Sequence, residues 1–466
     1  MKKVFLSGIA GTGMSALAGL FHARGDQVFG SDSQFYPPVD GILQRMGAQL
    51  FHGYDPTNIP ADTDFCVIGN VIARGNPEAE FILDSGREYY SLPEALYRFF
   101  IKGKKSVVVA GSHGKTTMAS FIAHLLYRAG LKPGFFIGGL PRNFKRNSRP
   151  ARGDYFISEG DEYDSAFFDR TSKFLKYRPT HLILTALDHD HLDFFPSIDL
   201  YVKSFRDLVN QVPAGGMIII NGDVAMTVQA VTNAFTPVFS YGEGSTDYRI
   251  ADIQPLAAGF RFSLVHGRRS WPFVSCLDGR YNIWNLSAGI VFGLRLGIEV
   301  EVIQNAVRSF RGVERRLSKL STIGQTVFLE DFAHHPTAIA AVLESLRQTH
   351  PHHCIKAIFE PRSWSLRRNF FQDRLAASFA AADRVVIKDV YEKEKIAPAE
   401  RLDVARLRSE LLAQGKEVLI FNDYDEIKRH LTAGDFHRPQ LVVLLSNGGF
   451  GDLANFVRQL ALNAVK

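Results

Sequence analysis

The stretch Ser106-Val-Val-Val-Ala110-Gly111-Ser-His-Gly114-Lys115-Thr116-Thr117 decides the fold of this chain. Its mostly apolar beginning, residues 106–110, predicts a buried strand, and a helical pattern runs from Thr116 to Arg128 directly after the glycines. A Gly-Lys-Thr turn between a strand and a helix is typical of a loop that binds a triphosphate. In such a loop, backbone N–H groups hold the phosphates, the lysine reaches the β- and γ-phosphates and the threonine hydroxyl reaches Mg²⁺. Val109 stands where the full G-x-x-x-x-G-K-T pattern has glycine, so only the shorter G-x-x-G-K-T form is present. The sequence therefore predicts an ATP-binding α/β domain whose phosphate loop comprises Gly111, Ser112, His113, Gly114, Lys115, Thr116 and Thr117.

The same order of strand, turn and helix occurs before and after this stretch. Near the N-terminus, strand 4–7 precedes the turn 8–13 and a helix over 15–23; later, strand 327–330 precedes the turn 331–336 and a helix over 337–347. Alternation of strands and helices predicts parallel sheets with ligand sites at the carboxyl ends of the strands. At about 150 residues per domain, 466 residues suggest about three domains.

Charged joints near 102–105 and 315–323 suggest where these domains end. We expect a Rossmann-like N-terminal domain over 1–104, a central P-loop ATPase domain with a mainly parallel sheet over 105–317, and a Rossmann-like C-terminal domain over 318–466. Alternating apolar residues also predict an antiparallel section at 248–273 in the central domain.

Composition excludes several classes of protein. The chain has 54 Lys and Arg against 48 Asp and Glu, a net charge of +6, without a block of like charges, so we expect no nucleic-acid partner. The cysteines Cys66, Cys276 and Cys354 lie far apart and never form CxxC, which argues against a disulfide scaffold and for a reducing, cytoplasmic location. The apolar N-terminal stretch 4–21 is broken by glycines, and no other uncharged run reaches ~18 residues, so we expect neither a signal peptide nor a membrane span.

A second glycine loop, Gly8-Ile-Ala-Gly11-Thr12-Gly13, also follows a strand and opens a helix. Such glycines let the backbone approach a pyrophosphate, and Asp32 ends the next predicted strand, where a ribose-binding acid would lie. The spacing is G-x-x-G-x-G, so the loop is also compatible with a tight turn that binds nothing. It does not distinguish NAD from a nucleotide sugar.

Acids and histidines follow two further predicted strands of the central domain. Ser158-Glu159-Gly-Asp161-Glu162 follows strand 155–157, and Asp188-His-Asp190-His191-Leu-Asp193 follows strand 181–185. In a nucleotide enzyme they would supply hard oxygen ligands and one imidazole for Mg²⁺. A rival interpretation is the H-x-H-x-D pattern of metallo-β-lactamase-like hydrolases, but Phe194 stands where that family has a histidine, and a Gly-Lys-Thr loop has no place there. The plain alternative is helix caps and solvated loop charges.

Read together, these motifs resemble the Mur ligase family over essentially the whole chain. The likeness rests on motifs in the family's order: Gly111–Thr117, Glu159 with Asp161 and Glu162, Asp190-His191-x-Asp193, Asn282-x-x-Asn285-x-x-Ala288, Phe310-x-Gly-x-x-Arg315-Arg316, and Asp331-Phe-Ala-His334-His335-Pro336. Tyr281 replaces the histidine that is common before the first of these asparagines. Each motif is modest alone, and their succession is specific.

The resemblance implies an ATP- and Mg²⁺-dependent ligase that forms amide bonds in peptidoglycan metabolism. It implies that Lys115, Glu159 and His191 are catalytic, and that Thr116, Glu159 and His191 hold Mg²⁺. ATP would also contact Asn282, Asn285, Arg316, Asp331 and His334. The substrate-binding residues that we expect are Gly11, Thr12, Gly13 and Asp32 for the UDP moiety, Gly139 and Asn143 near the muramyl group, Arg74, and Arg362 and Asn447 for the carboxylates of an amine substrate.

Histidine in the phosphate loop and the His-His-Pro motif indicate the family branch that acts on UDP-N-acetylmuramate. One member of this branch adds L-alanine in de novo synthesis, and another adds the recycled tripeptide L-alanyl-γ-D-glutamyl-meso-diaminopimelate. Several stretches resemble the second: Ser31-Asp32 followed by Tyr36-Pro37-Pro38, Arg74–Pro77, Glu162–Asp169, Glu360–Ser363 and Ser446–Gly451. We therefore expect the tripeptide as the amine substrate, with L-alanine as the alternative, and no obligate protein partner.

The chain departs from the family's pattern at two further positions, and two other functions remain open. Ala186-Leu187-Asp188 replaces the usual N-x-E, which leaves the role of Asp188 open, and Arg206 stands where some members carry a carbamylated lysine, so we expect none. A dinucleotide-dependent oxidoreductase would use the first glycine loop but leave Gly114-Lys115-Thr116 idle. A non-catalytic nucleotide-binding regulator would not need the metal-binding acids.

Overall fold

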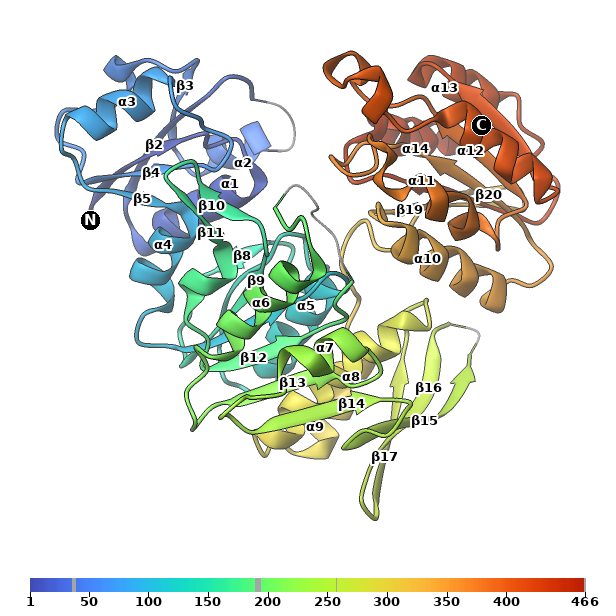
Figure 1. Ribbon diagram of the computed structural model, residues 1–466, viewed down its shortest axis with the longest axis horizontal. Coiled ribbons are helices and arrows are strands. Elements are labelled where there is room, and N and C mark those ends of the chain that lie inside the picture. The colour runs from blue at the N-terminus through green and yellow to red at the C-terminus, as the bar shows by residue number, and fades with distance from the viewer. Residues whose placement is uncertain (36–38, 189–193, 257, 465–466) are drawn as a thin grey trace. The chain divides into compact units, whose positions relative to one another are not determined.

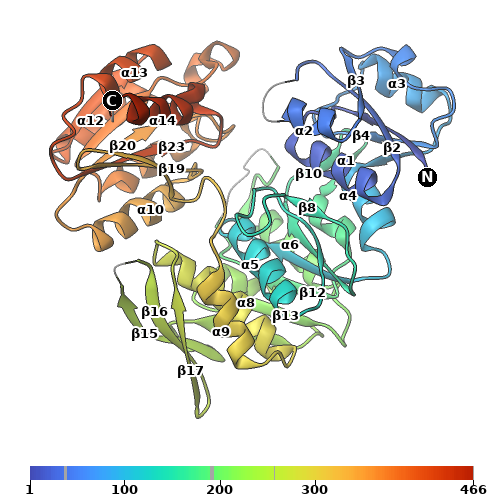
Figure 2. The same ribbon diagram turned by 180° about the vertical axis from the view of Figure 1, so that it is seen from behind.

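The computed structural model describes residues 1–35, 39–188, 194–256 and 258–464 (Figures 1 and 2). The chain forms two compact units, and each is described by itself. The first unit comprises residues 1–254, 261–276 and 284–312, and the second comprises 255–260, 277–283 and 313–466.

The N-terminal sheet of the first unit has five parallel strands in the order β3-β2-β1-β4-β5. These strands and their helices are β1 (Lys3–Ser7), α1 (Thr12–Arg24), β2 (Gln27–Asp32), α2 (Val39–Arg45), β3 (Gln49–His52), β4 (Phe65–Ile68), α3 (Pro77–Asp84), β5 (Tyr89–Ser91) and α4 (Leu92–Leu96). The carboxyl ends of β1 and β2 lie side by side, because Ser7 pairs with Ser31. The first glycine loop and Asp32 are therefore neighbours.

The second sheet has ten strands in the order β17-β16-β15-β14-β13-β12-β6-β9-β7-β8. The strands are β6 (Lys105–Ala110), β7 (Gly134–Phe136), β8 (Ser148–Arg149), β9 (Tyr155–Gly160), β12 (His181–Leu184), β13 (Met217–Asn221), β14 (Val238–Gly242), β15 (Tyr248–Pro255), β16 (Phe260–His266) and β17 (Arg269–Ser275). A separate antiparallel pair is formed by β10 (Asp164–Ala166) and β11 (Asp169–Ser172). The helices are α5 (Lys115–Arg128), α6 (Ile198–Val209), α7 (Ala225–Ala230), α8 (Tyr281–Arg295) and α9 (Val300–Ser309). Central strand β6 is parallel to both of its neighbours, β12 and β9, so the phosphate loop leaves the middle of the sheet.

The sheet of the second unit has six strands in the order β18-β19-β23-β20-β21-β22. Its elements are β18 (Ser318–Ile323), β19 (Thr326–Asp331), α10 (Pro336–Thr349), β20 (Cys354–Phe359), α11 (Gln372–Leu375), β21 (Arg384–Lys388), α12 (Val404–Ala413), β22 (Glu417–Phe421), α13 (Tyr424–Thr432), β23 (Gln440–Leu445) and α14 (Leu453–Ala464). Only β18 is antiparallel to its neighbour, β19. Separate apolar cores form on the two faces of the sheet, as alternating strand residues require; Ile355 and Ala357 belong to one core and Ile358 to the other.

The α/β class with mainly parallel sheets is confirmed, and the three strand–turn–helix units form where the sequence predicts them. Helix α1 begins at Thr12 instead of residue 15, because extended Gly11 occupies the N-cap position. The section expected at 248–273 forms β15, β16 and β17. The three larger sheets lie within the ranges 1–104, 105–317 and 318–466, which stay a prediction as domains. In the part of the chain that the structure describes, no helix combines the length and the apolar character needed to cross a membrane.

Candidate active site

The phosphate loop connects β6 to α5, and its glycines have conformations that side chains rarely adopt. Gly111 has a φ of +129° and Gly114 a φ of +81°. A Cβ atom on Gly114 would lie 2.2 Å from Oδ1 of Asn285, and one on Gly111 would lie 2.2 Å from Oγ1 of Thr185. The loop is therefore closely packed against α8 and the end of β12, which brings two of the predicted ATP-binding segments together.

Lys115, the first residue of α5, forms a buried ion pair with Glu162. Its Nζ lies 2.8 Å from Oε2 of Glu162, and the two side chains are 11% and 1% exposed. Burial by itself lowers the pKa of Lys115, but the carboxylates of Glu162, Asp161 and Glu159 outweigh it, so that the pKa lies above its usual value. The lysine is therefore fully charged at neutral pH and rigidly placed beside the phosphate loop.

Thr116 and Glu159 form the second polar pair of this site. The Thr116 hydroxyl donates to Oε1 of Glu159 (2.6 Å), and the backbone N–H of Gly138 donates to Oε2 (2.7 Å). Burial, and then the charge of Asp161, raise the pKa of Glu159 above its usual range. A hydroxyl and a carboxylate whose charge is only partly compensated are oxygen donors of the kind that Mg²⁺ prefers. These residues therefore fit a divalent cation.

Ser112 and His113 fasten the phosphate loop to the segment that follows β12. The Ser112 hydroxyl donates to the backbone oxygen of Asp188 (2.7 Å) and lies 2.6 Å from the hydroxyl of Tyr201. Nε2 of His113 lies 3.4 Å from Oδ2 of Asp188. The aspartate that departs from the family's pattern thus contacts the loop histidine. The predictions for Asp190, His191 and Asp193 lie outside the described residues.

The predicted adenine-side asparagines lie one turn apart on α8, so they share one face of that helix. The amide of Asn282 donates to the backbone oxygen of Asp278 (2.7 Å), whereas Asn285 lies against the phosphate loop, as described above. Asn143, predicted near the muramyl group, donates to the backbone oxygen of Ser309 (2.9 Å) and accepts from the N–H of Arg311 (2.8 Å). Its amide fastens its own loop to the end of α9, and its role toward a substrate stays a prediction, as does that of Gly139.

The first glycine loop makes a tight turn between β1 and α1, and its role in binding the UDP moiety stays a prediction. Gly8 has a φ of +82°, and its N–H and that of Ile9 donate to the backbone oxygen of Ser31 (2.9 and 3.0 Å). The loop ends at Gly11, so the first turn of α1 contains the predicted residues Thr12 and Gly13. Oδ2 of Asp32 accepts from the N–H of Ala10 (2.9 Å), which places the acid beside this helix terminus.

Sequence reasoning missed Glu78, which organises the carboxyl edge of the N-terminal sheet. It is fully buried and accepts hydrogen bonds from the hydroxyls of Ser7 (2.7 Å) and Ser31 (2.5 Å) and from the Asn58 amide (3.0 Å). Asn76 caps α3 and so directs Glu78 into the sheet. The Asn-Pro helix start was the only local signal for it. Arg74, which was predicted to bind substrate, is exposed and pairs with Glu80 (3.0 Å).

In the second unit, Asp331 ends β19 and is buried. Its carboxylate accepts from the N–H groups of Leu317 (2.7 Å) and Ala333 (2.8 Å). Burial raises the pKa of Asp331, and the Arg316 guanidinium opposes this effect. Nδ1 of His334 lies 2.9 Å from the backbone oxygen of Phe332. The predicted residues Arg316, Asp331 and His334 are thus gathered at one end of β19.

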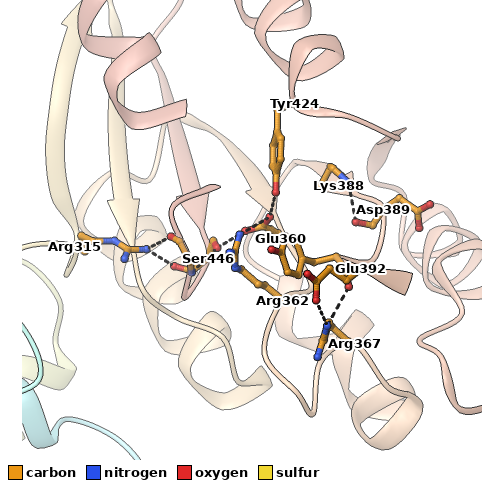
Figure 3. Close-up of polar contacts among 11 residues, drawn as sticks. Arg315, Glu360, Arg362, Arg367, Lys388, Asp389, Glu392, Tyr424 and Ser446 are labelled. Carbon is orange, nitrogen blue, oxygen red and sulfur yellow. Dashed lines mark hydrogen bonds and ion pairs between the residues drawn. The ribbon is translucent and has the colours of Figure 1, made fainter. Parts of the chain in front are cut away.

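Arg315, which the sequence analysis named only as part of the motif that ends in Arg316, has a structural role that sequence reasoning missed. It pairs with Glu330 (2.8 Å) and donates to the backbone oxygens of Ser446 (2.9 Å) and Gly448 (2.5 Å) (Figure 3). It therefore fastens the loop after β23 to the strand that carries Asp331. Only the tertiary fold reveals this role, because Ser446 and Gly448 are more than 100 residues away along the chain.

The predicted amine-substrate residues Arg362 and Asn447 surround Glu360, which follows β20. Glu360 is buried and accepts from the hydroxyls of Tyr424 and Ser446, both at 2.5 Å. The Arg362 guanidinium lies 3.6 Å from Glu360 and stacks 3.9 Å from the centroid of the Tyr391 ring (Figure 3). Oδ1 of Asn447 is buried and accepts no hydrogen bond from the described residues. This end of the sheet thus offers a cation and an unused acceptor.

Comparison with known proteins accounts for almost the whole chain. Residues 5–102 match the model for "Mur ligase family, catalytic domain", residues 109–293 that for "Mur ligase middle domain", and residues 315–448 that for "Mur ligase, glutamate ligase domain".

Relatives from several bacteria align over most of their length. The UDP-N-acetylmuramate–L-alanyl-γ-D-glutamyl-meso-2,6-diaminoheptandioate ligase of Escherichia coli is 33% identical over 97% of this chain and 96% of its own. The UDP-N-acetylmuramate–L-alanine ligase of Desulfosudis oleivorans is 31% identical over 83% of each chain. The crystal structure of a murein peptide ligase from Psychrobacter arcticus is 28% identical and has a TM-score of 0.74, over 100% of this chain and 99% of that one.

Proposed function

The chain belongs to the Mur ligase family, and from this membership we propose that it joins UDP-N-acetylmuramate to the tripeptide L-alanyl-γ-D-glutamyl-meso-diaminopimelate. The reaction is an ATP-dependent formation of a C–N bond between the lactyl carboxylate of the sugar and the amine of the tripeptide's L-alanine, in peptidoglycan recycling. For the tripeptide, the support is the E. coli relative, which matches 97% of this chain and is named for that substrate.

One observation carries the ligase chemistry. At the start of α5, Lys115 pairs with Glu162, which lies just beyond β9, and Thr116 donates to Glu159 at the end of β9. This cluster combines a fixed cation with hard oxygen donors beside a loop that can cradle phosphates. A dinucleotide-dependent oxidoreductase would need neither part.

We infer the following course of reaction. A carboxylate is a poor electrophile, so its oxygen attacks the γ-phosphorus of ATP and forms an acyl phosphate, with ADP as the leaving group. The amine nitrogen then attacks the acyl carbon, the amide forms, and phosphate leaves. Two anions meet in the first step, and the Lys115 ammonium neutralises the oxygens that approach it. Glu162 holds Lys115 in place through their 2.8 Å ion pair.

The remaining predicted residues are assigned to this reaction as follows. Thr116 and Glu159 would hold Mg²⁺, whose chemistry is to neutralise charge on the phosphate oxygens. Asp331 and His334 would face the γ-phosphate, Asn282, Asn285 and Arg316 would contact ATP, and the loop Gly11–Gly13 with Asp32 would bind the UDP moiety. We assign the contact with the γ-phosphate to domain 318–466, the binding of Mg²⁺ and ATP to domain 105–317, and the binding of the UDP moiety to domain 1–104. We place the enzyme in the cytoplasm, where its nucleotide substrates are made.

The test is ADP release with Mg²⁺-ATP and UDP-N-acetylmuramate, with the tripeptide compared with free L-alanine. We expect turnover that depends on the tripeptide, and little with L-alanine. Preference for L-alanine would make the chain a ligase of de novo synthesis, as the Desulfosudis oleivorans relative is named. If ADP is released with neither the tripeptide nor L-alanine, the proposed substrates are contradicted.

A further inference from the structure

Lys388 is a buried lysine that the reaction described above does not use. It ends β21 and is 8% exposed. Its ammonium donates to the backbone oxygen of Asp389 (3.2 Å) and lies 5.3 Å from the centroid of the Tyr424 ring (Figure 3). No ion pair involves Lys388 within the described part of the chain. A lysine has three donors, so this ammonium keeps donors for a further acceptor in a place where an unpaired charge is costly.

The acids around Lys388 are engaged by other groups. Glu360, which follows the neighbouring strand β20, accepts hydrogen bonds from the hydroxyls of Tyr424 and Ser446. Asp389 accepts from the ammonium of Lys393 (2.6 Å) and from the N–H of Val390 (2.7 Å). The charge of Asp389 also acts on Lys388, but among the described residues neither acid accepts a hydrogen bond from this ammonium, so the group that fits its remaining donors is an anion.

The fold holds this ammonium at the place where ligands bind to parallel sheets. Phe359 pairs with Ile387, so Glu360 and Lys388 leave adjacent strands at the carboxyl edge. The Tyr424 ring cannot move aside readily, because its hydroxyl bonds to Glu360 and its face presses on Gly451, where a Cβ would lie 2.2 Å from the ring. The cation is therefore positioned before any substrate arrives.

We propose that Lys388 binds the carboxylate at the far, diaminopimelate end of the peptide substrate; this inference rests on the proposed function. In the order β19-β23-β20-β21, Lys388 leaves the sheet three strand spacings from Asp331, which is about 14 Å at ~4.8 Å per spacing. If the alanine amine reacts near Asp331, a free amino acid cannot reach Lys388. An extended tripeptide spans about 10 Å, and the diaminopimelate side chain adds the remaining few ångströms.

Arg362 follows the strand between these two points and stacks on Tyr391, so it suits a carboxylate nearer the middle of the peptide. Lys388 then reads the group that distinguishes diaminopimelate from lysine. This assignment gives the variant Lys388→Met a specific defect: the peptide that ends in diaminopimelate binds more weakly, while a peptide that ends in L-lysine, and lacks the distal carboxylate, is unaffected.

The experiment measures kcat and KM for both tripeptides with wild type, Lys388→Met and Lys388→Arg. The control is Lys428→Met, which removes a partly exposed lysine of α13 paired with Asp425. We expect Lys388→Met to raise KM for the diaminopimelate peptide roughly 10- to 100-fold, as for a lost hydrogen bond to a charged group. The KM for ATP, the KM for the L-lysine peptide and kcat should stay near wild type, and Lys388→Arg should keep part of the affinity.

Thermal unfolding distinguishes a loss of substrate affinity from a loss of folding stability. Removing a buried charge that lacks a partner should leave the melting temperature of Lys388→Met unchanged or raised. Equal KM increases for both peptides, an unchanged KM for the diaminopimelate peptide, or a lower melting temperature with an unaltered ratio of the two KM values would each overturn the inference. Wild-type protein that does not use either tripeptide would instead overturn the proposed function, and with it this inference, before any variant is compared.

Discussion

Replacing Lys115 with methionine should damage folding and catalysis by separable amounts. The substitution takes the Lys115 ammonium away from Glu162, which is only 1% exposed and lies close to Asp161 and Glu159. Removing one member of a buried ion pair costs about 3–5 kcal/mol of the free energy of unfolding. The pKa of Lys115 is raised in the folded state, so this stabilisation is fully present below its unfolded pKa of about 10.5, and therefore at pH 7.

The double variant Lys115→Met/Glu162→Gln isolates the two effects. It also removes the charge of Glu162, so it should regain most of the lost stability. The rate of ADP release should stay at least ~10²-fold below wild type, because the phosphate-binding cation is still missing. Hydrogen exchange of the α5 amides reports the stability of this region by itself, which suits a chain with more than one compact unit. The control Lys203→Met breaks an exposed pair with Asp207 and should change stability by less than ~1 kcal/mol.

Three results would refute this reasoning. If α5 in Lys115→Met is protected as well as in wild type, or if the double variant is no more stable than the single one, the pair is not what holds Lys115 in place. If Lys115→Met releases ADP at the wild-type rate, the phosphate loop does not act as proposed.

Three further outcomes are expected. Burial, and then Asp161, raise the pKa of Glu159, so the free energy of unfolding should fall as pH rises from about 4.5 through the raised pKa, and urea denaturation of Glu159→Gln should lack this component. Gly114→Ala should raise KM for ATP about tenfold or more in steady-state assays, because a Cβ at a φ of +81° would collide with Asn285; an unchanged KM would contradict the close packing. Glu78→Ala leaves several buried donors unpaired and should cost about 3 kcal/mol or more, seen as faster hydrogen exchange in β1 and β2, whereas unchanged exchange would show that water replaces the carboxylate.

The parts of the fold that local signals specify could be predicted closely. Strand 106–110 followed by Gly111 and then by Gly114-Lys115-Thr116 carries its whole signal within a dozen residues, and β6 and α5 each begin one residue before the predicted position. The interaction partners of individual side chains could not be predicted from local signals. Glu78 and Ser7 are 71 residues apart, and Lys115 and Glu162 are 47 apart, so their pairing depends on the order of strands in the sheets.

The two ends of the proposed reaction differ in how well the sequence predicts them, because one is built from a continuous segment and the other from separate strand ends. The phosphate loop is one continuous segment, so its chemistry is legible as a motif. The amine end combines one polar residue from each of several strand ends, Glu360, Lys388 and Ser446, together with Tyr424 of α13. In the sequence, Glu360 and Ser446 begin stretches that resemble the tripeptide-adding member of the family, whereas Lys388 and Tyr424 belong to no recognised motif. They become neighbours because β23, the last strand of the chain, inserts between β19 and β20. A family motif therefore predicts how the carboxylate is activated. If the amine binds as proposed, its choice depends on strand order, and substitutions at these strand ends should change amine preference while leaving ATP use intact.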